Sequence, residues 1–268
     1  MALEPQSGSV LVRILKARRD AVAYRKRVLP EAVLRMGVAK ADPVRDFAAA
    51  LTRDAFNIIA ELKKASPSRG VLRADFDAAE LSSIFERAGA AALSVLTEED
   101  FFQGDLNYLR QAHRRVALPI LRKDFIVDPW QVWETRATNA DSFLLIVAAL
   151  AQETLVELLT LGRELGMEPL IEVHTREELD RALAAGARII GVNNRDLRTL
   201  HVFAETSLKL IEAIPDECIA VAESGLGWHA ELQQLRAVGF DAFLIGESLM
   251  TAADPAAALR ALLGESAK

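Results

Sequence analysis

Ionisable and amide side chains recur along this chain directly after short apolar runs. The residues at these positions are Glu61, Lys63, Lys123, Glu172, Asn193, Glu223 and Ser224. Lysines and carboxylates placed together push one another's pKa values apart, so one site can both donate and accept protons. The alternative is a structural ring of ion pairs over a core, but such a ring does not need lysine, carboxylate and amide groups together. The pattern therefore favours acid–base catalysis.

Glycine-containing segments carry a second kind of chemistry. Residues 224–227 read Ser-Gly-Leu-Gly, and residues 245–248 read Ile-Gly-Glu-Ser. Glycine lets the main chain approach a ligand closely, and backbone N–H groups at a helix start bind phosphate. If these segments follow the seventh and eighth strands of a barrel, they occupy the usual position of a phosphate site.

Eight apolar runs of about half a dozen residues would position these groups. The runs cover residues 56–62, 91–97, 118–124, 141–147, 168–173, 187–193, 218–224 and 241–246. Their starts lie 19 to 35 residues apart, which leaves room for one crossover helix after each strand. The spacing predicts an α/β fold: a single (β/α)8 TIM barrel over residues 1–268, with catalytic groups at the carboxyl ends of its strands.

Cap residues between the runs support the crossover helices. Asp128 followed by Pro129 is typical of a helix start, and Thr175 with Glu178 matches a capping box. Asn139 stands where a glycine most often ends a helix in the left-handed conformation. Crossover helices are expected at about 77–88, 128–137 and 175–186.

The first 52 residues form an N-terminal helical extension that precedes the first strand. Two helices are expected in it, at about 10–27 and 43–51. The extension must lie against the barrel, where it either closes the bottom or lines the mouth of the active site.

Composition restricts the possible partners. The net charge is −6 with both signs interspersed, which argues against nucleic acid as a partner. The basic cluster at 13–27 fits an amphipathic helix, and the apolar run at 143–151 is too short to span a membrane. Cys218 cannot form an internal disulfide and is predicted to be a core residue of a cytoplasmic protein. The four histidines show no metal-ligand spacing, so no metal site is expected.

Several motifs resemble the indole-3-glycerol phosphate synthase family of tryptophan biosynthesis. The resemblance covers about residues 10–263, and its most specific segments are residues 59–68, 94–104, 121–126, 168–173, 191–197, 222–225 and 244–250. Other phosphate-binding barrels share the last two segments, but not the run from Glu61 to Ser68 or the Lys123-Asp124-Phe125 triplet. The resemblance implies a carboxy-lyase that closes an indole ring, with loss of carbon dioxide and water, from 1-(2-carboxyphenylamino)-1-deoxyribulose 5-phosphate. It also implies that the reaction needs no metal or redox cofactor.

The resemblance also implies catalytic roles. Lys123 would be the general acid for ring closure, and Lys63 a second cation that binds substrate anions and assists dehydration. Glu172 would be the acid–base carboxylate, with Glu61 as its companion. The reacting hydroxyl groups would be bound by Asn193 and Ser224.

The same resemblance assigns substrate-binding residues. Gly225, Gly246 and the backbone amide of Glu247 would hold the phosphate, with the Glu247 carboxylate turned away from it. The substrate carboxylate would be bound by Ser66 and Arg195. Apolar walls around the aromatic ring would come from Phe102 and Phe125, although a core role is equally open for each.

Other side chains are expected to have structural roles. Arg122 should face the helices as a snorkelling or paired arginine, and the tryptophans at 130, 133 and 228 should contribute to packing. His174 is close enough to Glu172 to touch the site, but a supporting or surface role is favoured.

The alternatives are another phosphosugar barrel, such as phosphoribosylanthranilate isomerase, and a non-catalytic barrel that binds a phosphorylated ligand. Such an isomerase would require an early-strand cysteine or aspartate as its base, where this chain has Glu61 and Lys63. The expected partner is a small phosphorylated substrate, with no nucleic acid or membrane, and the chain is expected to be a monomer or weak homo-oligomer.

Overall fold

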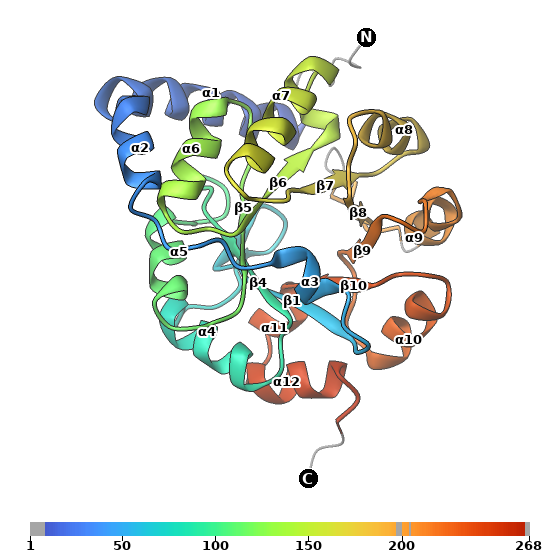
Figure 1. Ribbon diagram of the computed structural model, residues 1–268. Coiled ribbons are helices and arrows are strands. Elements are labelled where there is room, and N and C mark those ends of the chain that lie inside the picture. The colour runs from blue at the N-terminus through green and yellow to red at the C-terminus, as the bar shows by residue number, and fades with distance from the viewer. Residues whose placement is uncertain (1–8, 197–199, 204, 266–268) are drawn as a thin grey trace.

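The computed structural model describes residues 9–196, 200–203 and 205–265. Eight parallel strands close into a barrel in the order β1-β10-β9-β8-β7-β6-β5-β4, with helices around it (Figure 1). The barrel strands are β1 (Asn57–Leu62), β4 (Ala92–Leu96), β5 (Ile120–Lys123), β6 (Ser142–Ile146), β7 (Leu170–Val173), β8 (Ile189–Asn193), β9 (Ile219–Glu223) and β10 (Ala242–Ile245). Every strand falls within one of the predicted runs, so the predicted (β/α)8 barrel is confirmed.

Helices and short elements lie between the strands and after the last of them. They are α4 (Ala78–Arg87), α5 (Leu106–His113), α6 (Pro129–Ala137), η1 (Val147–Ala149), α7 (Gln152–Glu164), α8 (Arg176–Ala184), α9 (Glu205–Leu210), η2 (Ile211–Ala213), α10 (His229–Ala237), α11 (Glu247–Met250) and α12 (Pro255–Leu262), with a hairpin of β2 (Ala65–Ser66) and β3 (Gly70–Val71) after β1. The side chains of Asp77, Asp128 and Thr175 each accept a backbone hydrogen bond at a helix start. Asn139 has the predicted left-handed conformation, with φ of 62°.

Alternation along the strands decides which side chains enter the barrel. Ile59, Leu121 and Leu170 pack in the interior cluster, whereas their neighbours Ile58 and Ile120 belong to the cluster between the strands and the helices. The residue two positions further along a strand points the same way, but lies nearer the carboxyl end. The charged residues at these positions are Glu61, Lys123, Glu172 and, after Val221, Glu223.

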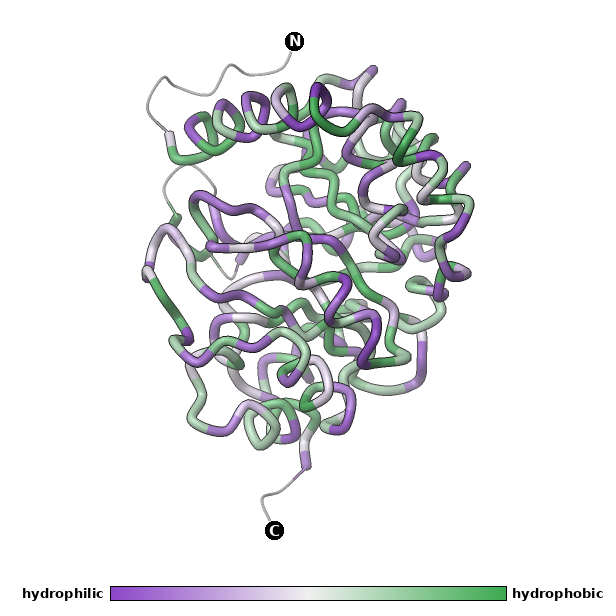
Figure 2. Tube along the Cα trace, turned by 90° about the vertical axis from the view of Figure 1, so that its left-hand side faces the viewer, coloured by the Kyte–Doolittle hydropathy of each residue, from purple (hydrophilic) through white to green (hydrophobic). Residues whose placement is uncertain are grey.

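The N-terminal extension contributes to both ends of the barrel. Helix α1 (Val10–Val28) crosses the mouth, where Leu11 and Ile14 line the same cavity as the strand-end residues (Figure 2). Helix α3 (Phe47–Leu51) lies at the opposite end, and the side-chain amide of Asn57, at the start of β1, donates to the carbonyl of Leu51 at 2.8 Å. The extension therefore both lines the mouth of the barrel, through α1, and closes its bottom, through α3.

A third helix in this extension, α2 (Glu31–Val38), was not predicted. Its Leu34 packs with Val22 of α1 and Trp130 of α6. Helices this short depend on tertiary packing more than on their own sequence pattern, which explains the missed prediction. The helix predicted from residue 43 begins only at Phe47, because Asp46 is its N-cap.

Buried ion pairs fix α1 to the barrel. Arg18, which is 2% exposed, pairs with Asp124 directly after β5. Asp124 also accepts hydrogen bonds from Thr97 at 2.5 Å and from Arg122 at 2.8 Å. Burial opposes ionisation of Asp124, but the guanidinium groups of Arg18 and Arg122 hold its pKa below the usual value. Arg122 is thus a buried, paired residue on the helix-facing side of β5, as predicted.

The tryptophans differ in burial. Trp130 is buried and Trp133 packs beside it, but Trp228 is 74% exposed, so the packing role predicted for Trp228 is wrong. Cys218 is partly buried against the core. Residues 1–8 of the predicted extension lie outside the described residues. In the part of the chain that is described, no helix is long and apolar enough to cross a membrane.

Replacing Arg18 by methionine should destabilise the protein much more than breaking an exposed pair on the same helix. Arg18→Met removes one of the two positive charges that compensate the buried carboxylate of Asp124. The loss is expected to lower the free energy of unfolding by about 3 kcal/mol. Lys26→Met removes the pair of Lys26 with Asp128, whose side chains are 45% and 28% exposed, and should cost less than about 1 kcal/mol. Urea unfolding measures both, and equal losses would contradict the anchoring role of Arg18.

Candidate active site

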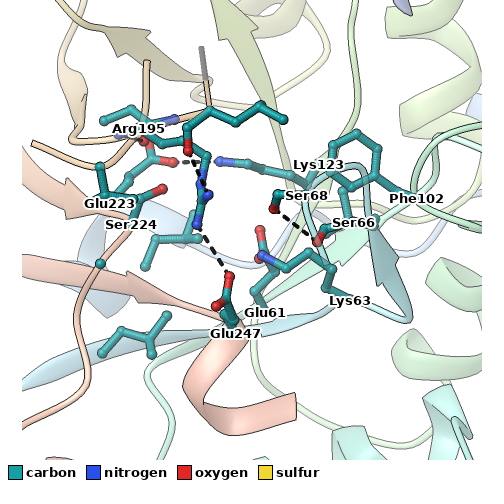
Figure 3. Close-up of a pocket in the computed structure, with 18 of the residues that line it drawn as sticks. Glu61, Lys63, Ser66, Ser68, Phe102, Lys123, Arg195, Glu223, Ser224 and Glu247 are labelled. Carbon is teal, nitrogen blue, oxygen red and sulfur yellow. Dashed lines mark hydrogen bonds and ion pairs between the residues drawn. The ribbon is translucent and has the colours of Figure 1, made fainter. Parts of the chain in front are cut away.

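One cavity of about 380 Å³ lies at the carboxyl-terminal end of the strands. It brings together all the residues that the sequence singled out (Figure 3). These are Glu61, Lys63, Ser66, Phe102, Lys123, Phe125, Glu172, Asn193, Arg195, Ser224, Gly225, Gly246 and Glu247. Because they come from the ends of seven strands or from the segments that follow them, barrel closure is what makes them neighbours.

The cavity lining combines apolar side chains with polar and charged groups. Beneath α1 the wall is formed by Leu11, Ile14 and the rings of Phe102 and Phe125, whose centroids are 6.3 Å apart. Figure 3 shows Ser224, directly after β9, across the cavity from Phe102, and the segment that follows β10 also lines this cavity. A ligand that fits this cavity would therefore combine an aromatic or aliphatic part with a polar, anionic part.

Lys123 points into the centre of the charged cluster. Its Nζ lies 2.5 Å from Oε2 of Glu223 and 3.3 Å from Oε2 of Glu172, and its side chain is 14% exposed. Burial disfavours the ammonium form. The surrounding carboxylates, of which Glu223 and Glu172 act most strongly, nevertheless hold the pKa of Lys123 above its usual value.

A second ion pair joins Lys63 to Glu61 on the other side of the cluster. Nζ of Lys63 lies 2.5 Å from Oε2 of Glu61, and Figure 3 shows the two side chains side by side. Burial of Glu61 opposes its ionisation, but the ammonium groups of Lys63 and Lys123 lower its pKa. Both lysines therefore have a carboxylate partner before any ligand binds.

Glu223 is the functional residue to which the sequence assigned no role. Its side chain is 1% exposed, and burial, together with the nearby carboxylates of Glu172 and Glu61, raises its pKa to about 7 against the attraction of Lys123. Gly191 on the neighbouring strand makes room for it, because a Cβ at residue 191 would overlap Oε1 of Glu223. Glu223 lies two residues after Val221 on the same strand, so alternation in the sequence predicts that its side chain enters the barrel. This pattern could have identified Glu223 from the sequence.

Gly246 has a similar steric role beside Glu61. A Cβ at residue 246 would overlap Oε2 of Glu61, so this glycine accommodates a carboxylate as well as allowing close approach to the main chain. Gly225 has a φ of +77°, and Ser224 before it has a φ of 66°. The turn after β9 is thus held in a left-handed conformation that exposes its backbone to the cavity.

Arginine side chains hold the carboxylate of Glu247. Its Oε2 lies 3.3 Å from Nη2 of Arg195, and its Oε1 lies 3.2 Å from Nη1 of Arg69. The negative charge of Glu247 is therefore compensated by the two arginines. The side chain of Asn193 accepts a hydrogen bond from the backbone of Arg195 at 2.9 Å, and Ser66 lies 3.4 Å from Ser68. Among the described residues, no group of three or more His, Cys, Asp or Glu side chains is arranged to hold a metal ion.

The closed barrel and the acid–base cluster at its carboxyl-terminal rim place the chain among the (β/α)8 barrels with an active site at that end. A family model described as "Indole-3-glycerol phosphate synthase" matches residues 11–262. The chain belongs to the indole-3-glycerol phosphate synthase family, which confirms the resemblance seen in the sequence.

Two relatives agree with this assignment, and a solved structure shares the fold. An indole-3-glycerol phosphate synthase from Chloroherpeton thalassium is 54% identical over 77% of this chain and 81% of its own. One from Rhodococcus jostii is 47% identical over 97% of this chain and 96% of its own. A 3-hexulose-6-phosphate synthase from Salmonella typhimurium superposes with a TM-score of 0.64 at 12% identity, over 78% of this chain and 97% of its own. At that identity the structural likeness shows the fold alone.

The raised pKa of Glu223 can be measured directly. With ¹³C-labelled glutamate carboxyl groups, NMR should show one carboxyl signal that titrates near pH 7 and disappears in Glu223→Gln. The carboxyl group is protonated below that pH, because burial and the neighbouring negative charges disfavour its ionised form. Titration of every glutamate signal below pH 5 would contradict this electrostatic description of the site.

Proposed function

We propose that the chain catalyses the reaction of its family, the conversion of 1-(2-carboxyphenylamino)-1-deoxyribulose 5-phosphate to indole-3-glycerol phosphate, carbon dioxide and water. The observation that carries the proposal is the position of Lys123 between two different walls of one cavity. The apolar wall beneath α1 suits the carboxyphenyl ring, and the glycine-containing wall suits the phosphate. The ketone of such a substrate lies between its ring and its phosphate, and so would approach Lys123.

Ring closure begins when the aromatic carbon that bears the carboxylate attacks the ketone carbon. The ketone oxygen gains negative charge as the new carbon–carbon bond forms, and Lys123 is assigned to protonate it. The carboxylates that hold Lys123 would also retain its proton. Protonation of Glu223, whose pKa lies near neutrality, removes one of these negative charges and so makes Lys123 a better acid.

Decarboxylation and dehydration complete the reaction. The carbon–carboxylate bond breaks and its electron pair restores the aromatic ring. The new hydroxyl group then leaves as water after it gains a proton, while the adjacent carbon loses one. Glu172 and Glu61 are assigned to these proton transfers, with Lys63 assisting the departure of the hydroxyl group and Asn193 and Ser224 orienting it.

Substrate binding follows from the lining of the two walls. The phosphate is assigned to the backbone N–H groups around Gly225, Gly246 and Glu247. The ring carboxylate is assigned to Ser66 and Arg195, and for that purpose the guanidinium of Arg195 would exchange its contact with Glu247 for the substrate.

Membership of the family favours this activity over the isomerase and over a non-catalytic phosphate-binding barrel. The reaction requires no redox change, and the assigned side chains supply every proton transfer. We further propose that the enzyme works in the cytoplasm on a small phosphorylated substrate, without nucleic acid or membrane partners.

Replacing Lys123 by methionine should abolish most turnover while leaving binding nearly normal. A general acid acts only as the transition state forms, so its loss should lower kcat by about 10²–10⁴-fold with little change in KM. Lys63→Met should raise KM as well as lower kcat. Arginine should not restore activity at residue 123, because it does not release its proton. Fluorescence of the indole product measures each variant.

Lys209→Met is a suitable control, because the Lys209 side chain is 71% exposed. This variant should keep wild-type kinetics. A Lys123→Met enzyme that retained more than roughly a tenth of wild-type kcat would exclude Lys123 as the general acid. Failure of the wild-type protein to form the indole product would refute the proposed function itself.

A further inference from the structure

His174 lies in the turn between β7 and α8, two residues after Glu172. Glu172 lines the cavity, whereas His174 is not among the described residues that line it. The histidine is nevertheless largely buried, with a side chain only 13% exposed. A buried ionisable side chain is costly unless it is paired with an opposite charge, and such side chains often occur at functional sites.

Two carboxylates flank the imidazole. Its Nε2 lies 3.3 Å from Oε1 of Glu172, and its Nδ1 lies 3.1 Å from Oε2 of Glu178. The other oxygen of Glu172, Oε2, lies 3.3 Å from Nζ of Lys123. One oxygen of Glu172 is therefore directed at the histidine, and the other at the proposed general acid.

The start of α8 fixes this arrangement. Thr175 accepts a hydrogen bond from the backbone N–H of Glu178 at 3.2 Å, as the predicted capping box requires. The Glu178 carboxylate, however, reaches one residue further back and accepts the backbone N–H of His174 at 2.7 Å. Glu178 is thus held by the main chain of His174 as well as by its ring.

The charge balance supports an imidazolium ion at this position. Burial disfavours protonation of His174, but its contacts with Glu172 and Glu178 raise its pKa to about 10. Burial likewise opposes ionisation of Glu172, and the positive charges of Lys123 and His174 lower its pKa to about 2. The other charged groups near Glu172 are the carboxylates of the cluster, which alone would have the opposite effect.

We propose that His174 is a positioning residue: its imidazolium, held by Glu178, binds one oxygen of Glu172, keeps that carboxylate charged and directs its second oxygen toward Lys123. The proposal rests on the proposed function, in which Glu172 transfers protons. It assigns His174 no contact with substrate.

His174→Gln tests the charge, because the glutamine amide can still donate a hydrogen bond toward Glu172. We expect kcat to fall by about tenfold, a typical effect of a misplaced catalytic group, with KM within about twofold of wild type. Without the imidazolium the pKa of Glu172 rises, so its carboxylate form is lost at a higher pH as the pH falls. ¹³C NMR of the glutamate carboxyl groups should therefore show the pKa of Glu172, about 2 in the wild type, raised by about one unit or more in His174→Gln.

His113→Gln is the matched control. His113 also pairs with a carboxylate, lying 2.8 Å from Asp42, and its side chain is 9% exposed. It ends α5, just before β5 begins, at the end of the barrel opposite the cavity. This variant should keep both kcat and the pKa of Glu172. An unchanged pKa of Glu172 in His174→Gln would overturn the proposal.

NMR of the histidine side chains provides a test that does not depend on turnover. The ring of His174, identified by its absence in His174→Gln, should remain protonated up to about pH 10. Glu178→Gln should lower that pKa, because one of the two carboxylates is removed. Titration of His174 near pH 6.5 would overturn the proposal even if the wild-type enzyme turns over. If the wild type forms no indole product, the proposed function fails. The titration of His174 then still tests the contact between His174 and Glu172.

Discussion

The ammonium group of Lys123, held among buried carboxylates, is the interaction on which the site depends. Its contacts with Glu223 and Glu172, at 2.5 and 3.3 Å, compensate negative charges that would otherwise be costly to bury at a barrel mouth. The carboxylates in turn keep the lysine charged despite its low exposure. Burial, together with the like charges of Glu172 and Glu61, raises the pKa of Glu223. A group that titrates near neutrality is what acid–base catalysis requires.

The same strand connects this cluster to the N-terminal helix. Lys123 points into the barrel, and Asp124, the next residue, is bound by Arg18 of α1. Helix α1 also supplies Leu11 and Ile14 to the cavity wall. Consequently α1 contributes to the candidate site as the barrel does, because its buried ion pair fixes Leu11 and Ile14 relative to Lys123, the proposed proton donor. Glycines complete the arrangement: Gly191 and Gly246 leave the space that the carboxylates of Glu223 and Glu61 occupy.

Much of this could be predicted from the sequence, for identifiable reasons. Strand periodicity located every barrel strand, and the strand ends located the charged residues that barrel closure brings together. Features that depend on tertiary contacts could not be predicted. Helix α2 forms because Leu34 packs on neighbouring helices, Trp228 is exposed although tryptophan usually packs, and the role of Glu223 depends on a glycine in another strand. The contacts of His174 required knowing where Glu178 points after it caps α8.

The most direct test of the central claim, that Lys123 protonates the substrate ketone, is a crystal structure with an unreactive analogue whose ketone is reduced to an alcohol. The account predicts the alcohol oxygen within about 3 Å of Nζ of Lys123, a hydrogen-bond distance. It also predicts the carboxyphenyl ring against Phe102 and Phe125 and the phosphate beside Gly225 and Gly246. An analogue bound in the cavity with its alcohol oxygen directed away from Lys123 would contradict the account.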